Sequence, residues 1–256
     1  MSTSSDETTR SLRPAPAETG GLSARAPLGI YDSGLGGLTV LREVQRQLPQ
    51  EAVVYFADTA HVPYGHRSAE EILEFNRQIL RFLAGQGVKL AIAACNTSSA
   101  LALPVVRREF DLPVVGMIEG GAELAAEVTR NGRIGLLATE STVRSGAYVE
   151  AFRALDPALR VYQQACPRLV PLIEAGQLAG GELRQALAEY LAPLQAAGVD
   201  TVVLGCTHYP LVAGEIRGLL GEKVALVDPA VRVVQKVRRL LAERGLLAAS
   251  PGGRHL

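Results

Sequence analysis

The feature that most constrains the fold is a regular alternation of short apolar runs with longer amphipathic stretches, which begins near residue 27. The runs are almost continuously aliphatic, which is typical of parallel strands covered on both faces, and the stretches between them have the length and periodicity of helices. We therefore expect an α/β fold with mainly parallel sheets. The predicted strands are Leu28–Tyr31, Val53–Ala57, Leu90–Ala94, Val114–Met117, Ile134–Ala138, Leu159–Tyr162, Val202–Leu204 and Val224–Val227, and the clearest helices are Ala69–Ala84, Gly121–Thr129, Leu183–Ala196 and Val231–Glu243.

The charge balance and the N-terminal composition limit the classes of partner. Lys and Arg together number 26, and so do Asp and Glu, so no net field favours nucleic acid or an anionic membrane. No stretch approaches the ~18 uninterrupted apolar residues that a membrane-spanning helix needs. Residues 1–26 are rich in Ser, Thr and Pro and have no apolar core segment, which indicates a disordered tail rather than a secretory signal. We expect a cytoplasmic protein that acts on a small molecule, with neither nucleic acid nor membrane as a partner.

Three cysteines, Cys95, Cys166 and Cys206, form no CxxC pair. An odd number in an intracellular chain argues against a disulfide framework. A zinc site would need clustered Cys and His ligands, and only His208 lies close to a cysteine in the sequence, so no metal is predicted. The cysteines are therefore either small core residues or reactive thiols.

Cys95 and Cys206 each follow a predicted strand and precede a polar segment, Asn96-Thr97-Ser98 in one case and Thr207-His208 in the other. In open parallel sheets, ligands bind beyond the carboxyl ends of the strands. The free N–H groups of a helix N-terminus bind carboxylates and lower the pKa of a thiol. The polar residues could equally be simple helix caps. The similarity of the two segments suggests two related lobes that each contribute one cysteine to a shared cleft.

Two opposed thiols suit one demanding reaction. Removing the α-proton of an amino acid without a pyridoxal cofactor needs a strong base that is held close and desolvated, and inversion also needs a proton donor on the opposite face. A thiolate and a thiol meet both needs, so we predict cofactor-independent inversion of the α-carbon of a small amino acid. A Cys206–His208 nucleophile would leave Cys95 unexplained, and the glycines of Asp32–Gly37 lack the spacing of a dinucleotide or phosphate loop.

Several motifs, spread along the chain and given below in sequence order, resemble those of the glutamate racemase family. The resemblance extends from about Leu28 to Leu246, and the Cys-Thr-His-Tyr-Pro form differs from aspartate racemase relatives, which usually carry an acidic residue after Cys-Thr. The motifs are Asp32-Ser-Gly-Leu-Gly-Gly37, Asp58-Thr-Ala60 with Pro63-Tyr-Gly65, Ala94-Cys-Asn-Thr-Ser98, Ser145-Gly-Ala-Tyr148, Pro171-Leu-Ile-Glu174 and Gly205-Cys-Thr-His-Tyr-Pro210.

The resemblance implies two pseudo-symmetric α/β domains with the active site in the cleft between them. The first domain would combine residues 27–119 with 229–256, the second would be 120–228, and 1–26 would be the tail. The resemblance also implies interconversion of L- and D-glutamate without a cofactor, supplying D-glutamate for peptidoglycan synthesis in the bacterial cytoplasm, and it is compatible with a homodimer.

The resemblance also assigns roles to individual residues. Cys95 would take the α-proton from D-glutamate and Cys206 from L-glutamate, with Asp32 near the substrate ammonium and the first cysteine. Without the resemblance, the assigned polar residues have plainer interpretations as helix caps, a Pro-Tyr-Gly turn, a structural histidine and a solvated helix-end glutamate. The remaining roles are substrate contacts for Ser33, Tyr64, Gly65, Asn96, Thr97 and Thr207, assistance to Cys206 by His208, and an auxiliary acidic group at Glu174.

Some positions depart from the family pattern. His61 stands where Arg or Lys is common, which argues against a role for charge there, and Gly120 replaces a common Pro, which predicts a looser crossover between the domains. Cys166, before Pro167, is predicted to be structural and outside the site. Two alternatives stay open: racemisation of aspartate or another small amino acid on the same scaffold, and a catalytically silent binding or regulatory homologue. The second would be expected to lose a cysteine or Asp32, and this chain keeps them.

Overall fold

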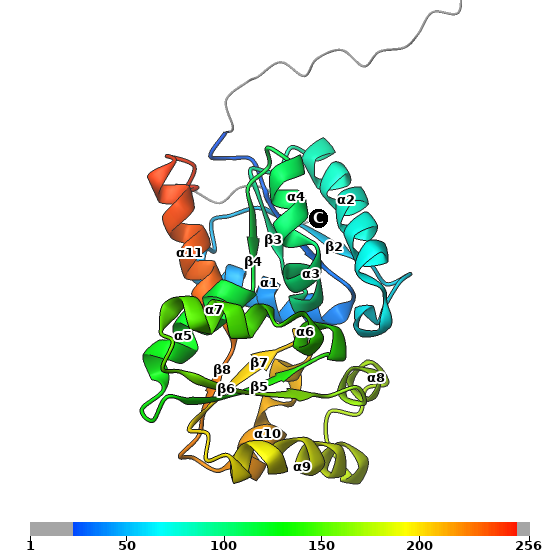
Figure 1. The fold of residues 1–256 in the computed structure, drawn as a ribbon. Coiled ribbons are helices and arrows are strands. Elements are labelled where there is room, and N and C mark those ends of the chain that lie inside the picture. The colour runs from blue at the N-terminus through cyan, green and yellow to red at the C-terminus, as the bar shows by residue number, and fades with distance from the viewer. Residues whose placement is uncertain (1–22, 250–256) are drawn as a thin grey trace, which may run out of the picture.

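The computed structural model describes residues 23–249, and within them the strands form two four-stranded, entirely parallel sheets (Figure 1). Their orders are β2-β1-β3-β4 and β6-β5-β7-β8, so the second sheet repeats the topology of the first. The predicted α/β class with two parallel sheets is confirmed. The strands are β1 (Leu28–Asp32), β2 (Val53–Ala57), β3 (Leu90–Ala93), β4 (Val114–Gly116), β5 (Arg133–Ala138), β6 (Arg160–Ala165), β7 (Thr201–Gly205) and β8 (Ala225–Val227).

Helices connect the strands, and local signals mark where some of them begin. Ser68 accepts a hydrogen bond from the backbone of Glu71, whose carboxylate accepts one from the backbone of Ser68, so a capping box starts α2. Asp228 caps α11, and Pro229 follows at the first helical position. The α-helices are α1 (Leu38–Gln47), α2 (Ala69–Gly85), α3 (Asn96–Leu101), α4 (Leu103–Glu109), α5 (Ile118–Val128), α6 (Glu140–Ser145), α7 (Ala147–Leu155), α8 (Leu169–Glu174), α9 (Gly181–Ala196), α10 (Ala213–Leu220) and α11 (Pro229–Glu243), with 3₁₀ turns at Leu35–Gly37, Tyr64–His66 and Tyr209–Val212.

Each sheet is covered on both faces. Side chains of α1 and α11 pack on one face of the first sheet, and those of α2 and α4 pack on the other. On the second sheet, α8, α9 and α10 cover one face and α5 and α7 cover the other. This double coverage explains the uninterrupted burial of the central strands β1, β3 and β7. We call the first sheet with its covering helices the first lobe, and the second sheet with its covering helices the second lobe (Figure 1).

The C-terminal helix α11 returns to the first lobe. Val233 and Val237 of α11 lie in one hydrophobic cluster with Leu28 and Ile30 of β1. A Cβ atom on Gly120 of α5 would lie 2.7 Å from Cγ2 of Val233, so α5 and α11 are in close contact. The prediction that Gly120 loosens the crossover is therefore wrong, because the missing side chain permits tighter packing. The domain limits inferred from the resemblance stay a prediction.

Strand β6 is longer than predicted. It runs to Ala165 rather than ending at Tyr162, because Gln163 and Gln164 continue a half-buried edge strand that apolar periodicity does not detect. This extension puts Cys166 directly after a strand. The predicted tail, 1–26, lies outside the described residues except for 23–26. No helix within residues 23–249 combines the length and apolar character needed to span a bilayer.

Candidate active site

One pocket lies between the lobes, at the carboxyl ends of their strands. It encloses about 530 Å³ of empty space, including its open mouth. The structure thus brings together nearly all the residues predicted for the site, while Asp32 and Glu174 are not among the lining residues but bond to Thr207 and His208, which are. The lining includes Ser33, Tyr64, Gly65, Cys95, Asn96 and Thr97 from the first lobe and Thr139, Glu140, Cys166, Cys206, Thr207 and His208 from the second-lobe side.

Cys95 is the N-cap residue of α3 and is 6% exposed. The backbone N–H groups of Thr97 and Ser98 and the side chain of Ser33 lower the pKa of its thiol. Burial acts more strongly in the opposite direction, and together with the charge of Asp32 it raises the pKa of Cys95 to about 11. The expected lowering of the thiol pKa is therefore wrong in net direction, because desolvation of the thiolate outweighs the helix N-terminus.

Cys206 follows β7 and is also almost fully buried. The expected α-helix does not begin here: a 3₁₀ turn covers Tyr209–Val212, and α10 begins only at Ala213. Pro210 has no N–H with which to continue a helical hydrogen-bond ladder from Cys206. Burial raises the pKa of the Cys206 thiol well above its ordinary value, and the backbone N–H of His208 acts in the opposite direction.

His208 links Cys206 to Glu174. Its Nδ1 lies 3.7 Å from Sγ of Cys206, and its Nε2 lies 2.6 Å from Oε1 of Glu174, the last residue of α8. The carboxylate therefore fixes the orientation of the imidazole ring beside the thiol. Glu174 reaches the second cysteine only through His208, and its contact with a buried histidine distinguishes it from a solvated helix-end glutamate.

Asp32 is enclosed by the glycine-rich loop that follows β1. Its Oδ2 accepts hydrogen bonds from the backbone N–H groups of Gly34 (3.1 Å) and Gly37 (2.9 Å), and its Oδ1 accepts one from Oγ1 of Thr207 across the cleft (3.2 Å). Burial raises the pKa of the Asp32 carboxyl, and the charge of His208 opposes this. A Cβ on Gly37 would lie 2.4 Å from Cβ of Asp32, so the glycine loop surrounds a carboxylate of the protein itself.

The same loop seats the first lobe against the Cys206 turn. A Cβ on Gly36 would lie 2.4 Å from Oγ1 of Thr207 and 2.6 Å from Nδ1 of His208. The hydroxyl of Thr39 of α1 shares its proton between the carbonyl oxygens of Gly36 at 2.8 Å and Thr207 at 3.1 Å. Gly36 thus permits the close approach of the two lobes, and Thr39 braces it.

Tyr64 and Gly65 form one wall of the pocket, and Asp58 anchors that wall. The hydroxyl of Tyr64 donates to Oδ2 of Asp58 at 2.5 Å, and Nδ1 of His61 lies 2.7 Å from Oδ1 of the same carboxylate. His61 also stacks on Phe75, with ring centroids 4.0 Å apart. The carbonyl oxygen of Gly65 accepts a hydrogen bond from the hydroxyl of Ser141 in the second lobe at 2.7 Å. His61 therefore supports the Tyr64 turn by contact and stacking.

Thr97 faces a threonine pair that was not predicted for the site. Its Oγ1 lies 3.0 Å from Oγ1 of Thr139 and 3.3 Å from Oγ1 of Thr142. Thr139 accepts a hydrogen bond from the backbone of Thr142 as the N-cap of α6, a role that conceals it among ordinary caps. The available signal was its position directly after β5, where ligand-binding residues gather.

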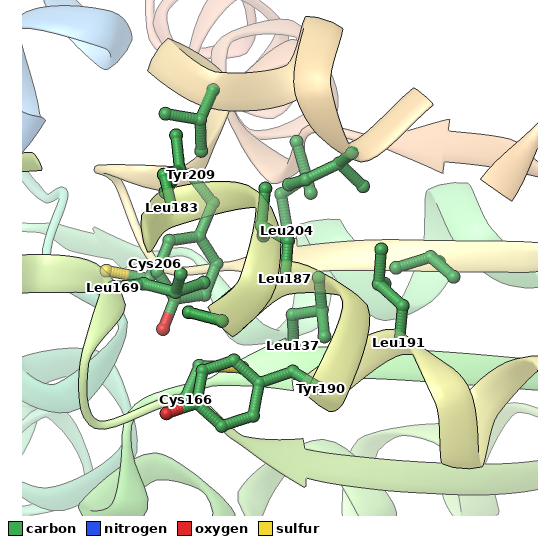
Figure 2. Close-up of a cluster of buried hydrophobic side chains, with 14 of the residues drawn as sticks. Leu137, Cys166, Leu169, Leu183, Leu187, Tyr190, Leu191, Leu204, Cys206 and Tyr209 are labelled. Atoms are coloured by element: carbon green, nitrogen blue, oxygen red, sulfur yellow. The ribbon is translucent and has the colours of Figure 1, made fainter. Parts of the chain in front are cut away.

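Cys166 lines the pocket, so its predicted place outside the site is wrong. Figure 2 shows it with Cys206 and Tyr209 along one side of the second-lobe core. Its Sγ donates to the carbonyl oxygen of Gln164 at 3.4 Å, and burial raises its pKa to about 12. The underestimated length of β6 hid this third cysteine that follows a strand.

Comparisons with known proteins agree with this geometry. The family model for Asp/Glu/hydantoin racemase matches residues 36–237. A glutamate racemase of Desulforudis audaxviator is 49% identical over 90% of this chain and 84% of its own length, and one of Gloeobacter violaceus is 52% identical over 84% and 80%. The crystal structure of glutamate racemase from Francisella tularensis in complex with D-glutamate superposes with a TM-score of 0.85 at 34% identity, covering 91% of this chain and 87% of that one.

Proposed function

The chain belongs to the Asp/Glu/hydantoin racemase family, and we propose on that premise that it interconverts L-glutamate and D-glutamate as a cofactor-independent isomerase. Relatives of about half-identical sequence, matched over most of their own length, are glutamate racemases. A structural relative holds D-glutamate. These similarities support a small amino acid as the substrate, bound in the pocket between the lobes.

The observation that carries the proposal is the presence of two buried thiols, Cys95 and Cys206, in one pocket but on different lobes. The Cys95 thiolate removes the α-proton of D-glutamate, and the Cys206 thiol delivers a proton to the opposite face of the same carbon. For L-glutamate the roles reverse. Conversion of D- to L-glutamate moves one proton from Cys206 to Cys95, and the reverse conversion moves one from Cys95 to Cys206. Proton exchange with water or turnover in the opposite direction restores the starting state.

The raised pKa values of the Cys95 and Cys206 thiols make their thiolates stronger bases. A thiolate that is hard to form is a better acceptor for the weakly acidic α-proton, at the cost of a small thiolate fraction. At the second thiol, His208 takes up the Cys206 proton, and Glu174 stabilises the imidazolium that results. At the first thiol, Asp32 attracts the substrate ammonium, whose positive charge offsets the repulsion between Asp32 and the thiolate.

The remaining predicted residues bind the substrate. Asn96, Thr97 and Thr207 donate hydrogen bonds to its carboxylates, and Ser33, Tyr64 and Gly65 shape the pocket. The family resemblance also supports a role in supplying D-glutamate for peptidoglycan synthesis, and thereby in cell-wall biogenesis and cell shape, in the cytoplasm. Assembly as a homodimer is a further prediction.

Racemisation in heavy water tests the proposal. We expect L- and D-glutamate to lose circular dichroism at comparable rates, and we expect the product to carry deuterium at the α-carbon by NMR or mass spectrometry. A panel of L-amino acids in the same assay distinguishes the alternatives. Faster turnover of aspartate than of glutamate would make aspartate the substrate. Retention of the original α-hydrogen would exclude the two-thiol mechanism. Absence of turnover with every amino acid would indicate a catalytically silent homologue.

A further inference from the structure

Asn96 carries a buried donor that the fold leaves unpaired. Its side chain is 3% exposed, lines the pocket and begins α3. Its Oδ1 accepts a hydrogen bond from the hydroxyl of Tyr148 at 2.8 Å, whereas its Nδ2 has no hydrogen-bond partner among residues 23–249. A buried N–H group without an acceptor costs free energy that a ligand carboxylate would recover.

Tyr148 reaches Asn96 from the opposite lobe. It belongs to α7, is fully buried and packs with Phe152 in the core of the second lobe. A Cβ on Gly121 would lie 2.8 Å from the Tyr148 hydroxyl oxygen, so the glycine makes room for that hydroxyl. Gly121 therefore leaves room for the Tyr148 hydroxyl in the second lobe, and this hydroxyl contacts the side-chain amide of Asn96 in the first lobe.

The hydrogen bond determines which end of the amide faces the ligand. A tyrosine hydroxyl that donates to Oδ1 leaves the NH₂ group of Asn96 as the free end. Burial raises the pKa of Tyr148 far above the working range, so the hydroxyl remains a donor. The flipped amide would leave the Tyr148 proton without this acceptor and would present a carbonyl oxygen to a carboxylate, which is repulsive.

We propose that Tyr148 is a positioning residue for substrate binding, which fixes the Asn96 amide so that Nδ2 donates to a carboxylate of the substrate. The inference rests on the proposed function, since it assumes a dicarboxylic amino acid in this pocket. Tyr148 acts through Asn96 and is not itself among the lining residues. Because the two residues belong to different lobes, carboxylate recognition by the first lobe depends on its contact with the second.

A double-mutant cycle tests the proposal. Tyr148→Phe keeps the packed ring and removes only the hydroxyl, so we expect KM for D-glutamate to rise roughly tenfold with kcat within about threefold, because a hydrogen bond to the carboxylate contributes to substrate and transition state alike. Asn96→Ala should raise KM at least as much. In the Asn96→Ala background, Tyr148→Phe should change KM by less than about twofold.

Two further variants keep the outcome interpretable. Tyr190→Phe keeps the packed ring and removes a hydroxyl that accepts hydrogen bonds from Arg168, which does not line the pocket, so its KM should not change. Gly121→Ala crowds the Tyr148 hydroxyl from α5 and should raise KM as Tyr148→Phe does. An unchanged KM in Tyr148→Phe, or the same KM increase with and without Asn96, would overturn the positioning role while the wild type still racemises glutamate. A wild type that does not racemise glutamate would instead defeat the proposed function, and the dissociation constant for D-glutamate by calorimetry would then test Tyr148 alone.

Discussion

The two cysteine turns occupy corresponding places in two similar sheets, yet their surroundings differ. Cys95 follows β3 and caps an α-helix, and the acidic group that acts on it is Asp32, at the end of β1. Cys206 follows β7 and precedes a 3₁₀ turn, and its neighbour is a histidine held by Glu174. The strand of the second sheet that corresponds to β1 is β5, which ends at Ala138 and is followed by Thr139 rather than by a carboxylate.

This difference shows that the fold repeats while the proton chemistry does not. Beside Cys206, an imidazole is available to accept the thiol proton. The negative charge of Asp32 opposes both thiolates, but at Cys95 it is the strongest effect after burial, and it acts there until a cation arrives. We infer that the second thiol is activated by the protein and the first by the ammonium of the substrate. The predictions below test this asymmetry, beginning with the largest effect.

Removal of either thiol should abolish racemisation in both directions. We expect Cys95→Ala and Cys206→Ala each to lower kcat/KM by roughly 10²- to 10⁴-fold, because each proton transfer needs its own acid/base group. Initial rates from L- and D-glutamate by circular dichroism measure the loss. Cys166→Ala is the matched control, because this third buried thiol also lines the pocket but transfers no proton in the proposed mechanism, so racemisation should persist. Near-normal rates in either of the first two variants would refute the two-thiol assignment.

Neutralising Asp32 should affect the first thiol in two opposed ways. We expect Asp32→Asn to lower kcat/KM by about 10- to 100-fold, because a charged partner for the ammonium is lost. The negative charge of Asp32 raises the pKa of Cys95, so its removal lowers that pKa. Since activity requires a thiolate, the rise of kcat/KM with pH should begin at lower pH in the variant than in the wild type.

The pH profile of Asp32→Asn therefore decides whether this carboxylate opposes the thiolate. A rise that begins at higher pH than in the wild type would mean that Asp32 supports the thiolate instead. Glu174→Gln serves as the comparison, because its carboxylate bonds His208 rather than the first thiol. In Glu174→Gln, the rise of kcat/KM with pH that reflects ionisation of Cys95 should begin at the same pH as in the wild type.

Neutralising Glu174 should lower kcat/KM by about tenfold, because His208 beside the second thiol loses a charge-assisted hydrogen bond. Because enantiomers have equal free energies in water, kcat/KM must fall by the same factor in both directions. The asymmetry appears in isotope effects instead. In Glu174→Gln, the α-deuterium isotope effect should increase from L-glutamate, where Cys206 abstracts the proton. An increase confined to D-glutamate would assign Glu174 to the wrong thiol.

Apolar periodicity was sufficient to predict the sheets and the places of Cys95 and Cys206. Both thiols follow central strands that are fully buried, so the aliphatic runs that precede them are unmistakable. Cys166 was missed because β6 is an edge strand with polar residues near its end. Local pattern therefore locates site residues well only where the strand before them is central.

The contacts between the lobes and the thiol pKa values could not be predicted locally. The hydrogen bonds from Tyr148 to Asn96 and from Thr207 to Asp32 join segments that only the folded chain brings together. The net direction of the Cys95 pKa depends on how deeply the thiol is buried, which a strand-then-polar pattern does not encode.

The smallest expected effect on activity distinguishes a buried hydrogen bond within one lobe from a buried hydrogen bond between the lobes. The hydroxyl of Ser99 accepts a hydrogen bond from the backbone of Met117 at 3.1 Å and shares its own proton between the carbonyl oxygens of Ala93 and Cys95, both at 3.0 Å. The hydroxyl of Thr39 instead lies between the carbonyl oxygens of Gly36 (2.8 Å) and Thr207 (3.1 Å), so it links the glycine loop of the first lobe to the Cys206 turn. Both are buried, so their deletions are comparable.

We expect Ser99→Ala to lower the free energy of unfolding by about 1–3 kcal/mol, because it leaves the buried N–H of Met117 unpaired. The change in kcat/KM should be small, because the carbonyl oxygen of Cys95 keeps its hydrogen bond from the backbone N–H of Ser99. Thr39→Val should cost only about 0.5–1.5 kcal/mol but should lower kcat/KM by up to about threefold, because the brace that it removes holds the Cys206 turn against the first lobe. Urea unfolding and steady-state kinetics measure both. If Ser99→Ala and Thr39→Val lost activity in the same proportion to their loss of stability, the geometry of the cleft would depend on the stability of the whole fold. It would then not depend on individual hydrogen bonds between the lobes.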